Sequence, residues 1–182
     1  MKRILIVVDM QNDFVDGALG TKEALAIVPG VTAKIQTFEP DCIYATRDTH
    51  QENYRDTQEG RNLPVPHCIQ KTEGWKIYPA VSAVMPQAVF VDKPSFGSPA
   101  LTHLLASRLQ KECNGDPAEM EIELVGLCTD ICVVSNALLL KAAMPEVKIS
   151  VDASCCAGVT AESHEAALTT MQMCQIHVYN RR

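Results

Sequence analysis

Blocks of apolar residues alternate with mixed segments along the chain, and this pattern predicts strands separated by helices. Short, continuous apolar runs are typical of strands that are buried on both faces of a parallel sheet. The chain contains six such runs, which we expect to form the strands of one sheet. They lie at residues 4–8, 42–45, 88–91, 122–125, 147–151 and 176–179.

Helical patterns lie between most of these runs. Residues 98–111 begin with Ser98 and Pro99, and a proline at the first helical position is typical of a helix start. Residues 131–143 are apolar almost all round, which predicts a buried helix. The remaining candidates are residues 31–38, just after Pro29-Gly30, and residues 160–172. The alternation predicts a three-layer, doubly wound α/β fold with a six-stranded, mostly parallel sheet.

Length, charge and the N-terminal pattern narrow the class of protein. The 182 residues fit a single domain spanning 1–182. The net charge of −6 predicts no nucleic-acid partner, because nucleic-acid binding favours a basic face. The apolar run at residues 4–8 is too short for a signal-peptide core or a membrane span, so we expect a cytoplasmic protein without a membrane partner. The eight cysteines are then expected to be reduced thiols.

Several polar residues follow predicted strand ends. Asp9, Asp48, Lys93 and residues 126–132 each come directly after an apolar run. In α/β sheets, ligands bind at the carboxyl ends of the strands. Residues 47–80 form a long polar stretch without a clear period, and loops of this length in compact domains are usually functional. These observations predict a site at one rim of the sheet.

Cys132 is the candidate nucleophile at this rim. Residues 126–132 leave a strand and enter a helix, which Asp130 is expected to cap. A thiol in the first turn of a helix is favoured as a thiolate, and the free backbone N–H groups there can hold an oxyanion. Asp9 could accept the thiol proton and Lys93 could stabilise the thiolate. Residue types alone leave open that Cys132 is a packed core cysteine and that Lys93 is a solvated strand-end lysine.

Three motifs strengthen this interpretation. Residues 8–14 (VDMQNDF) contain D-x-Q-x-D-F, residues 93–98 (KPSFGS) fit K-x-x-F/Y-x-S, and residues 126–132 (GLCTDIC) match G-x-x-T-D-x-C. In their order and spacing, these motifs resemble those of the isochorismatase-like cysteine hydrolases, over nearly the whole chain. The resemblance implies a catalytic triad of Asp9, Lys93 and Cys132.

The resemblance also implies how the triad works. The backbone N–H groups of Cys128 and Cys132 would form the oxyanion hole, and the Leu127–Cys128 peptide bond would be cis. Cys132 would attack an amide carbon, Asp9 would carry the proton to the leaving ammonia, and water would hydrolyse the thioester.

A metal site is expected in the long loop. Asp48-x-His50 and the later His67 form only a weak metal signal by themselves, because polar loops often carry surface histidines. The resemblance to the nicotinamidases within this family implies that Asp48, His50 and His67 are ligands, with Glu59 as a candidate fourth. Such mixed nitrogen and oxygen ligands suit a divalent metal, with Zn expected and Mn or Fe as alternatives.

The substrate pocket departs from the nicotinamidase pattern at one position. Those enzymes often have an aromatic residue three positions before the last histidine, and this chain has Pro64 there. Phe14, Phe96 and Trp75 are the candidate pocket walls, although Trp75 could instead anchor the loop.

We therefore expect a hydrolase that converts nicotinamide to nicotinate and ammonia through a cysteine thioester. The alternatives are hydrolysis of another small amide or ureido compound by the same triad, and a metal or thiol module without turnover. The resemblance also implies a homo-oligomer.

Overall fold

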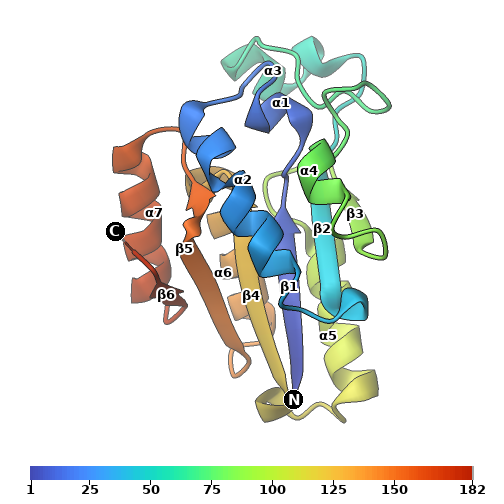
Figure 1. Ribbon diagram of the computed structural model, residues 1–182, viewed down its shortest axis with the longest axis vertical. Helices are drawn as coiled ribbons and strands as arrows, with labels where there is room; N and C mark the ends of the chain where they lie inside the picture. The colour runs from blue at the N-terminus through green and yellow to red at the C-terminus, as the bar shows by residue number, and fades with distance from the viewer. Residues whose placement is uncertain (182) are drawn as a thin grey trace.

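A six-stranded sheet forms the centre of the computed structural model, which describes residues 1–181 of the chain (Figure 1). The strand order is β3-β2-β1-β4-β5-β6, and every neighbouring pair is parallel. The strands are β1 (Lys2–Val8), β2 (Ile43–Asp48), β3 (Val89–Lys93), β4 (Met120–Leu127), β5 (Lys148–Ala157) and β6 (His177–Tyr179). The predicted doubly wound α/β fold is confirmed, with a sheet that is parallel throughout.

Helices cover both faces of the sheet. One face packs against α1 (Asn12–Val15), α2 (Lys22–Ile35) and α4 (Pro79–Ser82). The other packs against α5 (Pro99–Glu112), α6 (Val134–Ala143) and α7 (Ala161–Met173). Successive residues of a strand point to opposite faces, so Ile4 and Ile6 join one core and Leu5 and Val7 join the other. The shorter elements are α3 (Gln58–Asn62), three 3-10 turns (Pro40–Cys42, Tyr54–Asp56 and Pro117–Glu119) and the π turn η4 (Thr129–Val133).

The helix predicted at residues 31–38 begins earlier in the structure and spans Lys22–Ile35. Helix α2 begins at Lys22, where the Thr21 side chain accepts a hydrogen bond from the backbone N–H of Ala24. Pro29 lies inside this helix although it cannot donate a backbone hydrogen bond. The apolar stripe that α2 buries on the sheet outweighs the lost bond. The starts of α5 and α7 agree with the sequence, including the Ser98 cap of α5, whereas the helix predicted from residue 131 begins at Val134, after a π turn.

The carboxyl ends of the central strands meet at one rim. Asp9 follows β1, Asp48 ends β2, Lys93 ends β3, and η4 follows β4. Gly126 in β4 has φ +118°, and a Cβ there would lie 2.2 Å from the carbonyl oxygen of Val8. Glycine therefore allows β4 to approach β1 next to Asp9. None of the helices within residues 1–181 is both long and apolar enough to cross a membrane.

Candidate active site and metal centre

The structure brings Asp9, Lys93 and Cys132 together at this rim. The ammonium Nζ of Lys93 lies 2.7 Å from Oδ2 of Asp9 and 3.3 Å from Sγ of Cys132. All three side chains are buried, and the Asp9 and Lys93 side chains are fully enclosed. The ammonium therefore joins an acid and a thiol that are distant in the sequence.

The backbone holds Asp9 in an uncommon conformation. Its φ of +46° lies in the left-handed region, which few non-glycine residues adopt and which Asp tolerates better than most. The backbone N–H of Asp9 donates to the carbonyl of Thr46, and the Thr46 hydroxyl donates to Oδ1 of Asp9 at 2.6 Å. Oδ2 lies 2.7 Å from the Lys93 ammonium, so each carboxylate oxygen of Asp9 has a donor beside it. Sequence reasoning missed Thr46, which only the pairing of β1 with β2 brings to Asp9.

Burial sets the protonation of the triad at rest. It raises the pKa of the Cys132 thiol well above its usual value, and the Asp9 charge raises it further. Burial also raises the pKa of Asp9 despite the nearby ammonium. Burial alone would lower the pKa of Lys93, but the charge of Asp9 outweighs it and raises that pKa. These shifts favour the thiol form of Cys132 and the ammonium form of Lys93 in the resting site.

Cys132 lies in the π turn η4, immediately before α6. Asn136 of α6 is buried and donates to the carbonyl of Cys132 at 2.7 Å, while its side-chain oxygen accepts from the backbone N–H of Ser98. Asn136 thus ties the turn that carries Cys132 to the loop that follows Lys93. Its sequence position on an apolar helix offered no signal for this role.

Two local expectations about this turn are wrong. No cis peptide bond occurs within residues 1–181. Cys128 instead has extended angles (φ −85°, ψ 147°), and the chain changes direction in the π turn that follows. Asp130 does not cap this turn, because its carboxylate accepts hydrogen bonds from the backbone N–H of Val159 and from the hydroxyl of Ser163.

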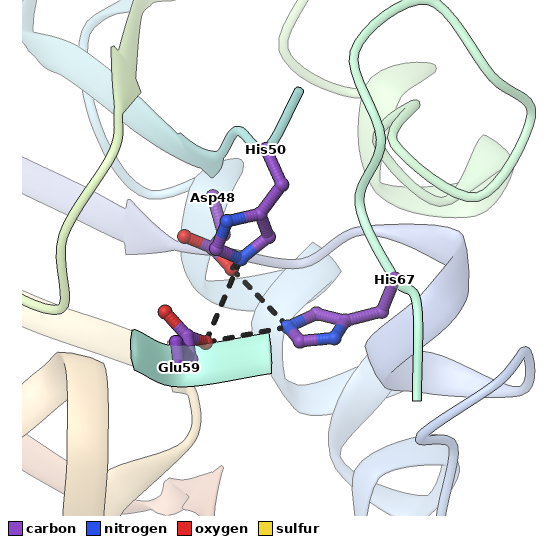
Figure 2. A group of neighbouring side chains, drawn as sticks. All are labelled: Asp48, His50, Glu59 and His67. Atoms are coloured by element: carbon purple, nitrogen blue, oxygen red, sulfur yellow. Dashed lines mark ion pairs between the residues drawn. The ribbon is translucent and has the colours of Figure 1, made fainter. Parts of the chain in front are cut away.

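Asp48, His50, Glu59 and His67 form a compact group beside the triad. Their ligand atoms all lie within 4.8 Å of one another. Figure 2 shows the four side chains pointing toward one another from β2, the loop after it, α3 and the loop before Cys68. Nε2 of His50 is 2.9 Å from Oδ2 of Asp48, and Nε2 of His67 is 3.7 Å from Oε1 of Glu59.

This group fits a divalent metal ion. Nε2 of His50 is buried and makes no well-formed hydrogen bond, although the Asp48 carboxylate is close. Nδ1 of His67 lies 2.9 Å from the carbonyl of Val65, an arrangement that fixes a ligating imidazole and directs its Nε2 inward. Two imidazole nitrogens and two carboxylate oxygens are a donor set suited to Zn, Mn or Fe.

Buried neighbours that the sequence did not reveal support this group. The Gln11 side chain donates to the carbonyl of Asp48 at 2.9 Å and accepts from its N–H at 2.7 Å. The Tyr54 ring packs edge-on against the rings of His50 and His67. Gln11 belongs to the D-x-Q-x-D-F motif, so the motif was the available signal for its importance.

A cavity of about 550 Å³ opens beside both groups. Cys128 and Cys132 line it on one side, and Asp48, Glu59 and His67 line it on another. Phe14 and Phe96 also line it, as expected for pocket walls.

Trp75 does not line this cavity. Its indole N–H donates to the hydroxyl of Thr49 at 2.8 Å, and the Arg47 guanidinium lies 4.0 Å from the centre of its ring. Trp75 thus anchors the long loop, which is the structural role left open for it.

Known proteins are similar to this chain along nearly its whole length. The nicotinamidase/pyrazinamidase of Mycobacterium tuberculosis is 26% identical over 189 residues, covering 97% of each chain. A nicotinamidase/pyrazinamidase structure from Bacillus subtilis matches with a TM-score of 0.81 at 27% identity, covering 98% of this chain and 99% of that one. The pyrazinamidase of Pyrococcus horikoshii in complex with zinc matches with a TM-score of 0.78 at 28% identity, covering 100% of both. The family model described as the isochorismatase domain matches residues 3–181. This chain therefore belongs to the isochorismatase family.

Proposed function

We propose that this protein hydrolyses nicotinamide to nicotinate and ammonia through a thioester on Cys132. One observation carries the proposal: the Lys93 ammonium contacts both Asp9 and Cys132, and Cys132 opens into a cavity that the candidate metal ligands share. Relatives along nearly the whole chain are named nicotinamidase or nicotinamidase/pyrazinamidase, which supports this substrate.

The first half of the reaction acylates the thiol. Asp9 accepts the Cys132 proton, and the sulfur attacks the amide carbon. The backbone N–H groups of Cys128 and Cys132 hold the oxygen of the tetrahedral intermediate. As the carbon–nitrogen bond breaks, Asp9 returns the proton to the leaving nitrogen, and ammonia departs.

The second half hydrolyses the thioester. Asp9 takes a proton from water, and the resulting hydroxide attacks the thioester carbon. The carbon–sulfur bond breaks, the sulfur regains a proton from Asp9, and the carboxylic acid leaves and loses its proton to solvent as nicotinate. Lys93 keeps its charge throughout and stabilises each sulfur anion. Because burial raises the pKa of Asp9, this carboxylate is a stronger base than an ordinary one.

The same proposal includes a divalent metal, most simply zinc, held by Asp48, His50, Glu59 and His67. When bound, such an ion supplies a Lewis acid that can take up the pyridine nitrogen and orient the ring. We also propose a cytoplasmic location, supported by eight cysteines that are all free.

A second candidate function is hydrolysis of a different small amide or ureido compound. The observation that favours it is the wall before His67, where Leu63, and no aromatic ring, faces the cavity next to Pro64. A stacking partner for a pyridine ring is thus absent at that position.

These two functions can be distinguished by measuring ammonia release from three compounds. The protein used should first have its metal content determined. Nicotinamide should release ammonia and nicotinate in equal amounts. Benzamide, which lacks the ring nitrogen, should be cleaved less efficiently, and a ureido acid should be inert. Faster cleavage of the ureido acid would favour the second function. If the metal-loaded protein releases ammonia from none of these compounds, the remaining alternative is a metal or thiol module without turnover.

A further inference from the structure

We propose that the site selects primary carboxamides whose aromatic ring carries an apolar substituent. The amide nitrogen must be unsubstituted, whereas the ring can extend toward the cavity mouth. This inference rests on the proposed amide hydrolysis and adds the substrate class.

The cavity is larger than one small aromatic amide requires. Its volume of about 550 Å³ lies within the range of pockets that enclose drug-sized ligands, about 300–1,000 Å³. The metal ligands and the cysteines that line it lie together, since Asp48 contacts Lys93, which contacts Cys132. A nicotinamide bound between these two groups therefore leaves the outer part of the cavity unfilled.

The wall of this outer part is mostly apolar, although Gln58, Asn62 and Ser95 also line the cavity. Leu19, Leu63, Phe96 and Val159 come from four separate segments and line the same cavity, and we call them the apolar rim. Leu63 is 38% exposed, Phe96 is 46% exposed and Val159 is 57% exposed. Exposed apolar side chains that gather at a binding cavity gain most when an apolar ligand group covers them. An apolar ring substituent is the part of a substrate that would do so.

The opposite end of the site is closed. Asp9 and Lys93 are 0% and 1% exposed, and neither belongs to the cavity wall, whereas Cys132 does. Asp9 must reach the leaving nitrogen to return its proton, so this nitrogen points away from the mouth and into the enclosed end. A group attached to that nitrogen would meet buried side chains, and protein interiors accommodate added volume poorly. Room for a substituent therefore exists only on the ring side.

Substituents at the open, ring side of the cavity and at the enclosed, amide side should affect the kinetics differently. Each methylene that a ring substituent buries on the apolar rim should raise kcat/KM about fourfold. The gain should appear as a lower KM with an unchanged kcat, because the contact is equally strong in the ground state and the transition state. A methyl group on the amide nitrogen should instead lower kcat/KM about a hundredfold or more, mainly through kcat, because it displaces the amide carbon from the sulfur.

The experiment compares nicotinamide with 5-methyl-, 5-ethyl- and 5-propylnicotinamide and with N-methylnicotinamide, following release of ammonia or methylamine. Leu63→Ser tests the apolar rim. Leu104→Ser is the matched control, because Leu104 is 39% exposed on α5 and lies outside the cavity wall. We expect the alkyl series to improve in the parent protein and in Leu104→Ser, and to lose most of its gain in Leu63→Ser.

Two results would overturn the inference: kcat/KM that falls along the alkyl series, or N-methylnicotinamide cleaved as well as nicotinamide. Cleavage of the alkylated amides without cleavage of nicotinamide would support the inference and refute the proposed natural substrate. Failure to cleave any amide would refute both.

Discussion

Oδ1 of the Asp48 carboxylate lies 3.5 Å from the ammonium of Lys93. Its other oxygen, Oδ2, lies 2.9 Å from Nε2 of His50. One side chain thus contacts both the triad and the candidate metal ligands. Asp48 ends β2 beside Lys93 at the end of β3, and these two residues are register partners in the sheet. Strand pairing therefore fixes the separation between the Lys93 ammonium and the candidate metal ligand Asp48.

Loss of one imidazole should remove the metal. His50→Ala deletes a buried nitrogen that has no well-formed hydrogen bond in the protein. We expect metal affinity to fall at least about tenfold, as it does when even an outer partner of a ligand is lost. Metal content after dialysis measures this, with the exposed His103→Ala as the control. Unchanged metal content in His50→Ala would rule out the assigned ligand set.

The Asp9–Lys93 pair should show strong coupling in stability. Lys93→Met leaves a buried carboxylate without its partner, which should lower the free energy of unfolding by about 3 kcal/mol. Asp9→Asn combined with Lys93→Met removes both charges and should restore most of this loss, without restoring activity. Asparagine suits the positive φ of this position. Urea unfolding of the single and double variants tests the coupling, and strictly additive losses would argue against a tight buried pair.

Asp130 should act as a positioning residue for the cavity wall. Its carboxylate holds the backbone N–H of Val159, whose side chain lines the cavity. Asp130→Ala should cost about 1–2 kcal/mol in unfolding free energy and raise KM more than it lowers kcat. Asp130→Asn keeps one acceptor oxygen and should recover part of KM. A change in stability with no change in KM would reduce Asp130 to a purely structural role.

The strand ends predicted where the site lies, whereas the triad and the metal ligands were predicted from the resemblance of the motifs to the isochorismatase-like hydrolases. Continuous apolar runs revealed the strands, and parallel strands bring Asp9, Asp48 and Lys93 to one rim. Thr46 and Asn136 could not be predicted in the same way, because their hydrogen bonds depend on how β1 meets β2 and how α6 meets the loop at Ser98.

Local sequence signals give wrong expectations where tertiary contacts outweigh them. Pro29-Gly30 looked like the boundary before a helix, but the buried apolar stripe carries α2 through it. Trp75 looked like a pocket wall, but its contacts with Thr49 and Arg47 hold it outside the cavity.

A buried ionic cluster away from the cavity predicts how stability depends on pH. Lys34 lies 2.8 Å from Asp152 and 2.9 Å from Glu123. Burial alone would raise the pKa of Asp152, but hydrogen bonds from Lys34 and Ser154 outweigh it and lower that pKa. A carboxylate whose pKa is lower in the folded protein stabilises the fold at any pH above its unfolded-state pKa of about 3.9. This stabilisation is lost as the pH falls through the pKa of the folded state.

Asp152→Asn should therefore be less stable at pH 6 and lose less stability than the parent protein between pH 5 and pH 3. Urea unfolding at these pH values measures the effect, with Asp56→Asn at an exposed position as the control. An equal loss of stability on acidification in the parent protein and in Asp152→Asn would contradict the assignment.

The most direct test of the account is the rate of ammonia release from nicotinamide by Cys132→Ala. Cys42→Ala is the control, because Cys42 is also a buried free thiol but precedes β2 at its amino end, away from the rim that carries the triad. We predict a loss of about 10⁴-fold or more in kcat for Cys132→Ala with folding retained, and near-parent activity for Cys42→Ala. Near-parent turnover by Cys132→Ala would contradict the central claim that this sulfur is the nucleophile.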